Sequence, residues 1–184
     1  SELVGVSPRH VCLLFRRFQA YEGDLTQRYV RALEARRIPH VLVGGRSFHG
    51  REEVMAVRTA PEAIEWPDDE LTVYATLRGP LFGVTDEELL CFRNDVHRLH
   101  PLRRFDAAER KAHSSVVDAL EVLRALHFAG NGRPIADTVE QLLSETRAHA
   151  ALAMWPTGEQ ALANALSIVD LAHALEQRGV TSFR

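Results

Sequence analysis

The chain has 184 residues, of which 46% are hydrophobic and 26% are charged, and its formal net charge is −3. This length and composition allow a buried core for one domain, or for one domain with part of another. No apolar run approaches the roughly 20 residues of a transmembrane helix. Two cysteines, Cys12 and Cys91, are too few for a disulfide framework or a zinc cluster. We therefore expect a globular protein of the reducing cytoplasm with no membrane partner.

Charge is distributed unevenly along the chain. Residues 1–60 carry 10 Arg against 6 Asp and Glu, whereas residues 61–184 carry 12 Lys and Arg against 19 Asp and Glu. The N-terminal surplus of Arg suits contacts with phosphate groups, and the acidic remainder argues against nucleic-acid binding along the whole length. A solvated surface without a ligand explains the surplus equally well.

The N-terminal pattern predicts a βαβ unit. Two apolar runs, His10–Arg16 and His40–Val43, are typical of strands, and Cys12 would be buried in the first. Between them Asp24 can cap a helix on which apolar residues recur at helical spacing: Leu25, Tyr29 and Leu33. Strands joined this tightly run parallel and need neighbouring strands and covered faces. The unit thus implies further sequence or a partner chain, and its open edge allows a homo-oligomer.

The rest of the chain predicts helices. A short helix over Arg51–Ala60 would end before Pro61, and the linker around Trp66 marks a boundary between a domain of residues 1–65 and one of residues 66–184. From Asp68 onward we expect helices alone. The expected face of the first of these holds Leu71, Tyr74 and Leu77.

Further helices follow in this second domain. A capping box at Thr85–Glu88 begins a helix, and Ser114–Ala129 carries one apolar stripe that ends at Gly130. Pro134–Ala153 and Gly158–Gln177 each read as one amphipathic helix, the last closed by Gly179. The expected fold class is an α/β start followed by a mostly α-helical domain, and α-rich overall.

Motifs for catalysis are absent from the sequence. A phosphate-binding loop needs a lysine after its glycines, and the only lysine, Lys111, has no glycine loop before it. His97 and His100 are spaced for one helical face but lack the further ligands of a metal site, and exposed histidines are the simpler interpretation. No clustered carboxylates with a lysine indicate a nuclease. We expect no cofactor in these residues.

The segment Val41–Val54, VLVGGRSFHGREEV, together with His10–His40 before it, resembles the start of the second RecA-like motor domain of UvrD/Rep-type DNA helicases. In that family a strand ending in an aromatic residue and Arg is followed by a helix, Ile-Pro, and GG-x-x-F with an acidic residue nearby. The matching residues here are Phe15-Arg16, Arg31-Ala32-Leu33, Ile38-Pro39, Gly44-Gly45, Phe48 and Glu53.

A second stretch, DDELTVYATLRGPLFGVTDEELLCF, resembles the start of the inserted accessory domain of RecB- and AddA-like helicases. The matching residues are Leu71, Ala75, Leu77, Arg78, Pro80-Leu81-Phe82, Asp86 and Leu89. The end of the chain, ALANALSIVDLAHALEQRGVTSFR, is similar to a later helix of the same proteins. Core packing alone would also explain PLFG and the leucines. The order and spacing of the segments carry the resemblance.

The resemblance implies site residues. Arg16 would face single-stranded DNA, Arg17 would add a phosphate contact, and Phe18, which stands where the family has Asn, could stack on a base. Pairing of Arg16 with a carboxylate inside the motor domain is an equal alternative. Gly44 and Gly45 would form an interdomain hinge. For Arg46 and Arg51, a salt bridge to Glu52 or Glu53 at that hinge is favoured over DNA contact.

The function implied is that of a fragment of an ATP-dependent DNA helicase acting in repair or recombination. The fragment would cover the opening of motor domain 2A and much of helical domain 2B, and would itself be inactive. The parent protein would bind ATP and Mg²⁺ and act on DNA, and it could pair with a companion helicase-nuclease subunit. The alternative is a stand-alone helical protein-interaction module with a βαβ edge and no catalysis.

Overall fold

The computed structural model describes residues 6–17, 19–20, 23–41, 46–130, 132–155 and 157–179. The chain divides into two compact units, Ser1–Arg51 and Glu52–Arg184. We call them the N-terminal unit and the helical unit, and each is described by itself. The expected boundary lay between residues 65 and 66, and the division between the two units falls between residues 51 and 52.

The described residues of the N-terminal unit form only short elements. A 3-10 turn, Pro8–His10, precedes two short strands, β1 (Gln19–Ala20) and β2 (Gly23–Asp24), which pair antiparallel. Two helices follow, α1 and α2. Their bounds are Thr26–Glu34 and Arg46–His49.

The expected parallel βαβ unit is not supported. Residues 11–15 form no strand, and residues 40–41 are also irregular, while residues 42–43 of the second expected strand lie outside the described part. Val11, Leu13 and Leu14 are each more than half exposed. A strand of a parallel sheet needs both faces covered, and such exposure is incompatible with that cover. Cys12, expected in a buried strand, is exposed as well.

Helix α1 confirms the helix expected after Asp24. It ends at Glu34, and Arg37 adopts a positive φ of 52°. The backbone N–H of Ile38 donates to the carbonyl oxygen of Leu33 over 3.0 Å. This bond returns the chain against the last turn of the helix, as a left-handed residue at a helix end commonly does.

The helical unit contains eight helices in its described residues and no strand there. The protein is therefore α-rich overall, and helix from Asp68 onward is confirmed. The helices are α3 (Glu52–Glu65), α4 (Glu70–Arg78), α5 (Asp86–Val96), α6 (Ala107–Ala112), α7 (Ser114–Gly130), α8 (Ile135–Glu145), α9 (Ala148–Ala153) and α10 (Gly158–Glu176). Within the part of the chain that is described, none of these helices is long and apolar enough to cross a bilayer.

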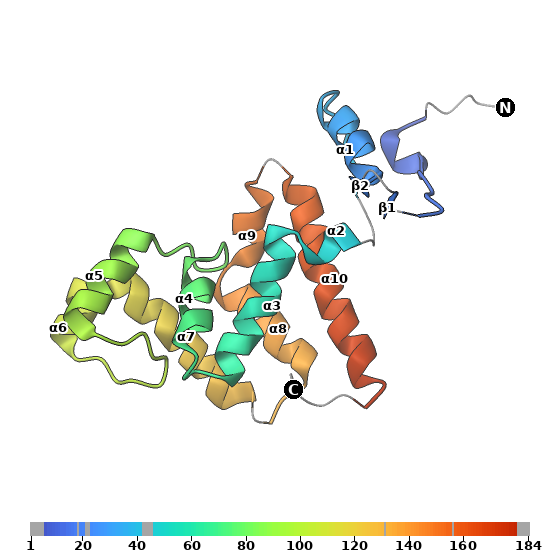
Figure 1. The fold of residues 1–184 in the computed structure, drawn as a ribbon. Helices are drawn as coiled ribbons and strands as arrows, with labels where there is room; N and C mark the ends of the chain where they lie inside the picture. Colours follow the sequence, from blue (N-terminus) through green and yellow to red (C-terminus); the bar gives the residue numbers. More distant parts are fainter. Residues whose placement is uncertain are drawn as a thin grey trace. The chain divides into compact units, whose positions relative to one another are not determined.

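Helix α3 is central to the core of this unit. It packs against α4, α7 and α10, and α10 also contacts α8 and α9. Figure 1 shows α5 and α6 extending to one side of this group, joined to it by α7. Val57, Ala60 and Ile64 of α3 are almost fully buried. Helix α3 was expected in the first domain, residues 1–65, and it contributes to the core of the helical unit.

Pro61 does not end α3 as the sequence predicted. The helix continues for four further residues, to Glu65, with Pro61 buried inside it. Proline removes one backbone N–H and disfavours a helix interior. Burial of Ala60, Ala63 and Ile64 on either side of it stabilises the continued helix.

Local signals predicted most of the other helices correctly. The capping box at Thr85 and Glu88 is present, and α7 buries the predicted stripe of Val116, Val117, Leu120 and Leu123. On α4, however, Leu77 is buried but Leu71 is exposed, and the inner face is completed by Val73 and Thr76.

The single helix expected over Pro134–Ala153 is two helices. Arg147, with φ of 52°, separates α8 from α9. Helix α10 follows the predicted range to within one residue, and Gly179, with φ of 89°, lies in the turn after it.

Candidate functional site

The residues expected to contact DNA lie in the N-terminal unit. Arg16 and Arg17 are both exposed. Phe18 lies outside the described residues, and so do Gly44 and Gly45 of the expected hinge. Of these five residues, the structure therefore describes Arg16 and Arg17.

Arg51 and Glu53 fall on opposite sides of the division between the units. Arg51 is half-buried, and its backbone N–H donates to the carbonyl oxygen of Phe48 over 3.2 Å. Glu53 lies in the first turn of α3, and only 6% of it is exposed. Its carboxyl oxygen Oε1 accepts a hydrogen bond from Nδ2 of Asn164, at 2.6 Å. The partner of Glu53 is thus an amide of α10, where the sequence suggested an arginine.

The bond to Glu53 belongs to a longer buried chain of polar groups. Nε2 of Gln160 donates to Oδ1 of Asn164 over 2.8 Å, and both amide side chains are buried. Sequence reasoning missed these two residues. A signal was available, because Gln160 and Asn164 are spaced by one helical turn and lie among small apolar residues on the buried face of α10, which holds Ala161 and Ala165.

Residues 68–92 form a closed corner between α4 and α5. Nε of Arg78 and the hydroxyl of Tyr74 both donate to Oδ1 of Asp86, each at 2.7 Å. Arg78, followed by Tyr74, holds the pKa of Asp86 below its ordinary value. The backbone N–H of Val84 donates to the carbonyl oxygen of Leu77, and the leucines of the segment are buried in the core: Leu77, Leu81 and Leu89. These residues shape the corner of the fold.

The loop after α5 is held by acidic residues at the start of α4. One carboxyl oxygen of Glu70 accepts both a guanidinium N–H of Arg93 and, at 2.7 Å, the backbone N–H of Leu99. The bond from Arg93 is the main reason that the pKa of Glu70 lies below its usual value. Nε2 of His100 lies 3.0 Å from Oδ1 of Asp68, while its Nδ1 accepts from the backbone of Leu102. His100 therefore helps to hold the same loop.

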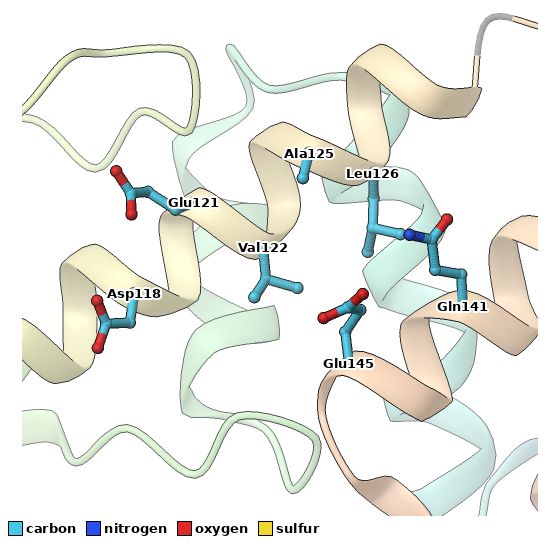
Figure 2. Close-up of a pocket in the computed structure, with 7 residues that line it drawn as sticks. All are labelled: Asp118, Glu121, Val122, Ala125, Leu126, Gln141 and Glu145. Carbon is cyan, nitrogen blue, oxygen red and sulfur yellow. The ribbon is translucent and has the colours of Figure 1, made fainter.

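A groove with a volume of about 280 Å³ lies between α7 and α8. Figure 2 shows side chains of both helices meeting there. Its apolar floor comes from α7, and carboxylates stand around it. The lining residues are Asp118, Glu121, Val122, Ala125, Leu126, Gln141 and Glu145.

The described residues contain no group of three His, Cys, Asp or Glu side chains placed to hold a metal ion. Lys111 is exposed on α6. Arg16, Arg17 and the groove are accessible to solvent, whereas the polar clusters around Asp86 and Glu70 hold the fold together.

No protein-family model matches the chain, and no curated protein matches it with significant similarity.

Proposed function

We propose that this chain is part of an ATP-dependent DNA helicase of the UvrD/Rep type, and in particular of a RecB- or AddA-like protein. The N-terminal unit would be the opening of motor domain 2A, and the helical unit would be much of accessory domain 2B. Three segments that resemble this family occur in the family's order along the chain, and this order supports the proposal.

The observation that carries the proposal is the burial of Glu53. Glu53 is the acidic residue of the GG-x-x-F motif, and its hydrogen bond to Asn164 ties the end of this motif to α10. The motif also spans the division between the two units at residues 51 and 52. A connection between a motor domain and a domain inserted into it would need such a fixed starting point.

In the whole protein, ATP and Mg²⁺ would bind between two RecA-like domains and drive movement along single-stranded DNA. Arg16 and Arg17 would contact the phosphates of that strand, and Phe18 would stack on a base. Gly44, Gly45, Arg51 and Glu53 would lie at the hinge between motor and accessory domain. Under the same proposal, the parent helicase would act in DNA repair or recombination in the cytoplasm. It would also pair with a companion helicase-nuclease subunit.

A second candidate is a helical protein-interaction module without catalysis. It is favoured by the core of the helical unit, which is continuous from α3 to α10 and buries residues from most of its helices. A unit with such a core can serve as a binding scaffold whether or not a motor accompanies it.

The two candidates are separated by the full-length protein encoded around these residues. The helicase proposal expects a Gly-Lys-Thr loop upstream and a Gln-x-x-Arg-type motif downstream in the same reading frame, together with DNA-stimulated ATP hydrolysis and strand separation. A reading frame without these motifs, or a purified protein without ATPase activity, would contradict the helicase proposal and support the module.

The role of the arginines is tested in that same protein by Arg16→Glu and Arg17→Glu. Each change should weaken single-stranded DNA binding and lower the slope of log affinity against log salt by about 0.7 for each phosphate interaction that it removes. Arg178→Glu, an exposed arginine beyond α10, serves as the control. Equal effects of the three changes would exclude Arg16 and Arg17 from the DNA-binding surface.

A further inference from the structure

The groove between α7 and α8 combines an apolar floor with an acidic rim. Val122, Ala125 and Leu126 of α7 form the floor, and Ala125 is exposed to solvent. Gln141 and Glu145 close the side formed by α8, and Figure 2 shows Glu145 facing Val122 across the gap. The volume is about 280 Å³, at the lower end of the roughly 300–1,000 Å³ that is usual for small-molecule sites.

The rim is already a binding site for a guanidinium group at one end. Arg110 of α6 binds Glu121 through both of its terminal nitrogens, one of them 2.7 Å from Oε2 of Glu121, and it lies 3.8 Å from Asp118. At the other end Glu145 is exposed, and its carboxylate makes no hydrogen bond or ion pair with any other described residue. One carboxylate of the rim is thus left for a cation from outside the chain.

The chemistry of the groove selects its occupant. Carboxylates around the mouth repel phosphates and acidic peptides and attract a basic group. The floor suits the methylene stem of a long basic side chain, which buries its carbons while its head stays at the rim. An arginine head can also bind a carboxylate through two parallel hydrogen bonds, as Arg110 does here.

A neighbouring aromatic residue extends the surface beyond the groove. Phe128 follows Ala125 by three residues, so its side chain lies beside that of Ala125 on the same side of α7. It is 60% exposed, with the guanidinium of Arg124 at 5.7 Å from its ring. A large exposed aromatic ring next to an open groove is suited to contact with an apolar residue of a partner.

We propose that this groove binds an arginine side chain of a partner protein, next to an apolar residue of that partner that packs on Phe128. The arginine stem would cover Val122 and Ala125, and its head would bind Glu145. The inference rests on the helical unit alone and does not depend on the proposed helicase function.

The test uses the whole chain and a labelled, alanine-rich helical peptide that carries one Arg and one Leu four residues apart. Fluorescence anisotropy should give saturable binding, and ¹⁵N NMR should place the shift changes on α7 and α8, at Val122, Ala125, Leu126 and Gln141. The same peptide with Glu in place of Arg should not bind.

Two variants of the chain separate specific docking from general attraction. Glu145→Lys should weaken binding by about tenfold or more, since it replaces an attractive charge with a repulsive one. Ala125→Trp should weaken it to a similar degree by filling the groove at an exposed position. Asp170→Lys, at an exposed carboxylate of α10, is the matched control and should leave binding unchanged.

Several results would overturn the proposal. These are the lack of saturable binding to the unaltered chain, shift changes elsewhere than α7 and α8, or equal weakening by Glu145→Lys and Asp170→Lys. Full binding by Ala125→Trp would also overturn it, because the interaction would then need charge but no groove. None of these results bears on ATP hydrolysis by the full-length protein, so the two proposals fail separately.

Discussion

Asn164 donates a hydrogen bond from its side-chain amide to the carboxyl group of Glu53, over 2.6 Å and across 111 positions of the chain. Both side chains are buried between α3 and α10, and Gln160 donates in turn to Asn164. Buried polar groups are stable only when their hydrogen bonds are made. This requirement fixes which face of α10 meets the first turn of α3.

Replacement of Asn164 tests this connection. Asn164→Ala leaves the buried carboxyl of Glu53 without its donor, so the free energy of unfolding should fall by about 1–3 kcal/mol. Urea denaturation of the whole chain measures the change. Glu52→Gln alters an exposed neighbour of Glu53 and should stay within about 0.5 kcal/mol of the unaltered chain. Equal stabilities of the two variants would mean that the hydrogen bond contributes nothing.

Gly158 is required where α9 turns into α10. A Cβ atom built on it would lie 2.5 Å from the carbonyl oxygen of Ala153 and 2.9 Å from that of Leu152. Because these are backbone atoms, they cannot move aside cheaply, and Gly158→Ala should destabilise the protein by about 1–3 kcal/mol.

The matched control for this change is Gly132→Ala, since a Cβ atom there meets nothing within 4 Å. Its effect should lie between no change and a gain of about 1 kcal/mol from the lower entropy of the unfolded chain. Thermal unfolding followed by circular dichroism compares the two. A Gly158→Ala protein as stable as the Gly132→Ala protein would contradict the close approach.

The ionisation of Glu70 should make the free energy of unfolding depend on pH. Its pKa is lowered from the ordinary value of 4.5, chiefly by the hydrogen bond from Arg93. For a depressed folded-state pKa, the stabilisation is complete above the unfolded value of 4.5 and disappears as the pH falls through the folded value.

Glu70→Gln should therefore lower the free energy of unfolding by about 1–2 kcal/mol near neutral pH, and this difference should shrink toward pH ~3. Urea titrations of both proteins at several pH values measure it. Asp170→Asn, on the exposed side of α10, is a suitable comparison. A difference between Glu70→Gln and the unaltered chain that stays constant with pH would exclude an ionic contribution.

Phe92 should be among the most costly residues to replace. Its side chain is fully buried, and its ring makes edge contacts with Phe105 and His113 at centroid distances of 5.8 and 5.5 Å. Phe92→Ala should cost about 3–5 kcal/mol through reduced burial and a cavity. Leu90→Ala, at an exposed position of the same helix, should change the urea midpoint little. A small effect of Phe92→Ala would indicate that α5 and α6 collapse into the cavity.

Features fixed by neighbouring residues could be predicted from the sequence. The capping box at Thr85 and the apolar stripe of α7 depend on interactions within one or two helical turns, so their spacing was sufficient. The break at Arg147 could not be predicted, because an arginine with positive φ carries no local signal. Pro61 caused the opposite error, since tertiary packing outweighs its local effect.

The candidate sites were predictable in part for the same reason. Glu53 was singled out from the resemblance of its segment, and its role at a hinge stays a prediction. Its partner Asn164 lies far away in the sequence, and a single sequence carries no sign of such a pairing. The groove depends on which turn of α8 lies beside Ala125 and Val122. Amphipathic spacing predicts that each helix has an inner face without predicting which helix covers it.

The place of α3 has a practical consequence for dividing the protein. A cut at the compositional boundary near Trp66 would take away the helix whose Val57, Ala60 and Ile64 cover α4, α7 and α10. The remaining piece would expose that apolar surface to water and lack the acceptor for Asn164, so we expect it to aggregate on expression. A piece that starts at or just before Glu52 keeps the apolar face of α3 and the acceptor Glu53. It is the shortest piece of the helical unit that we expect to fold when expressed alone.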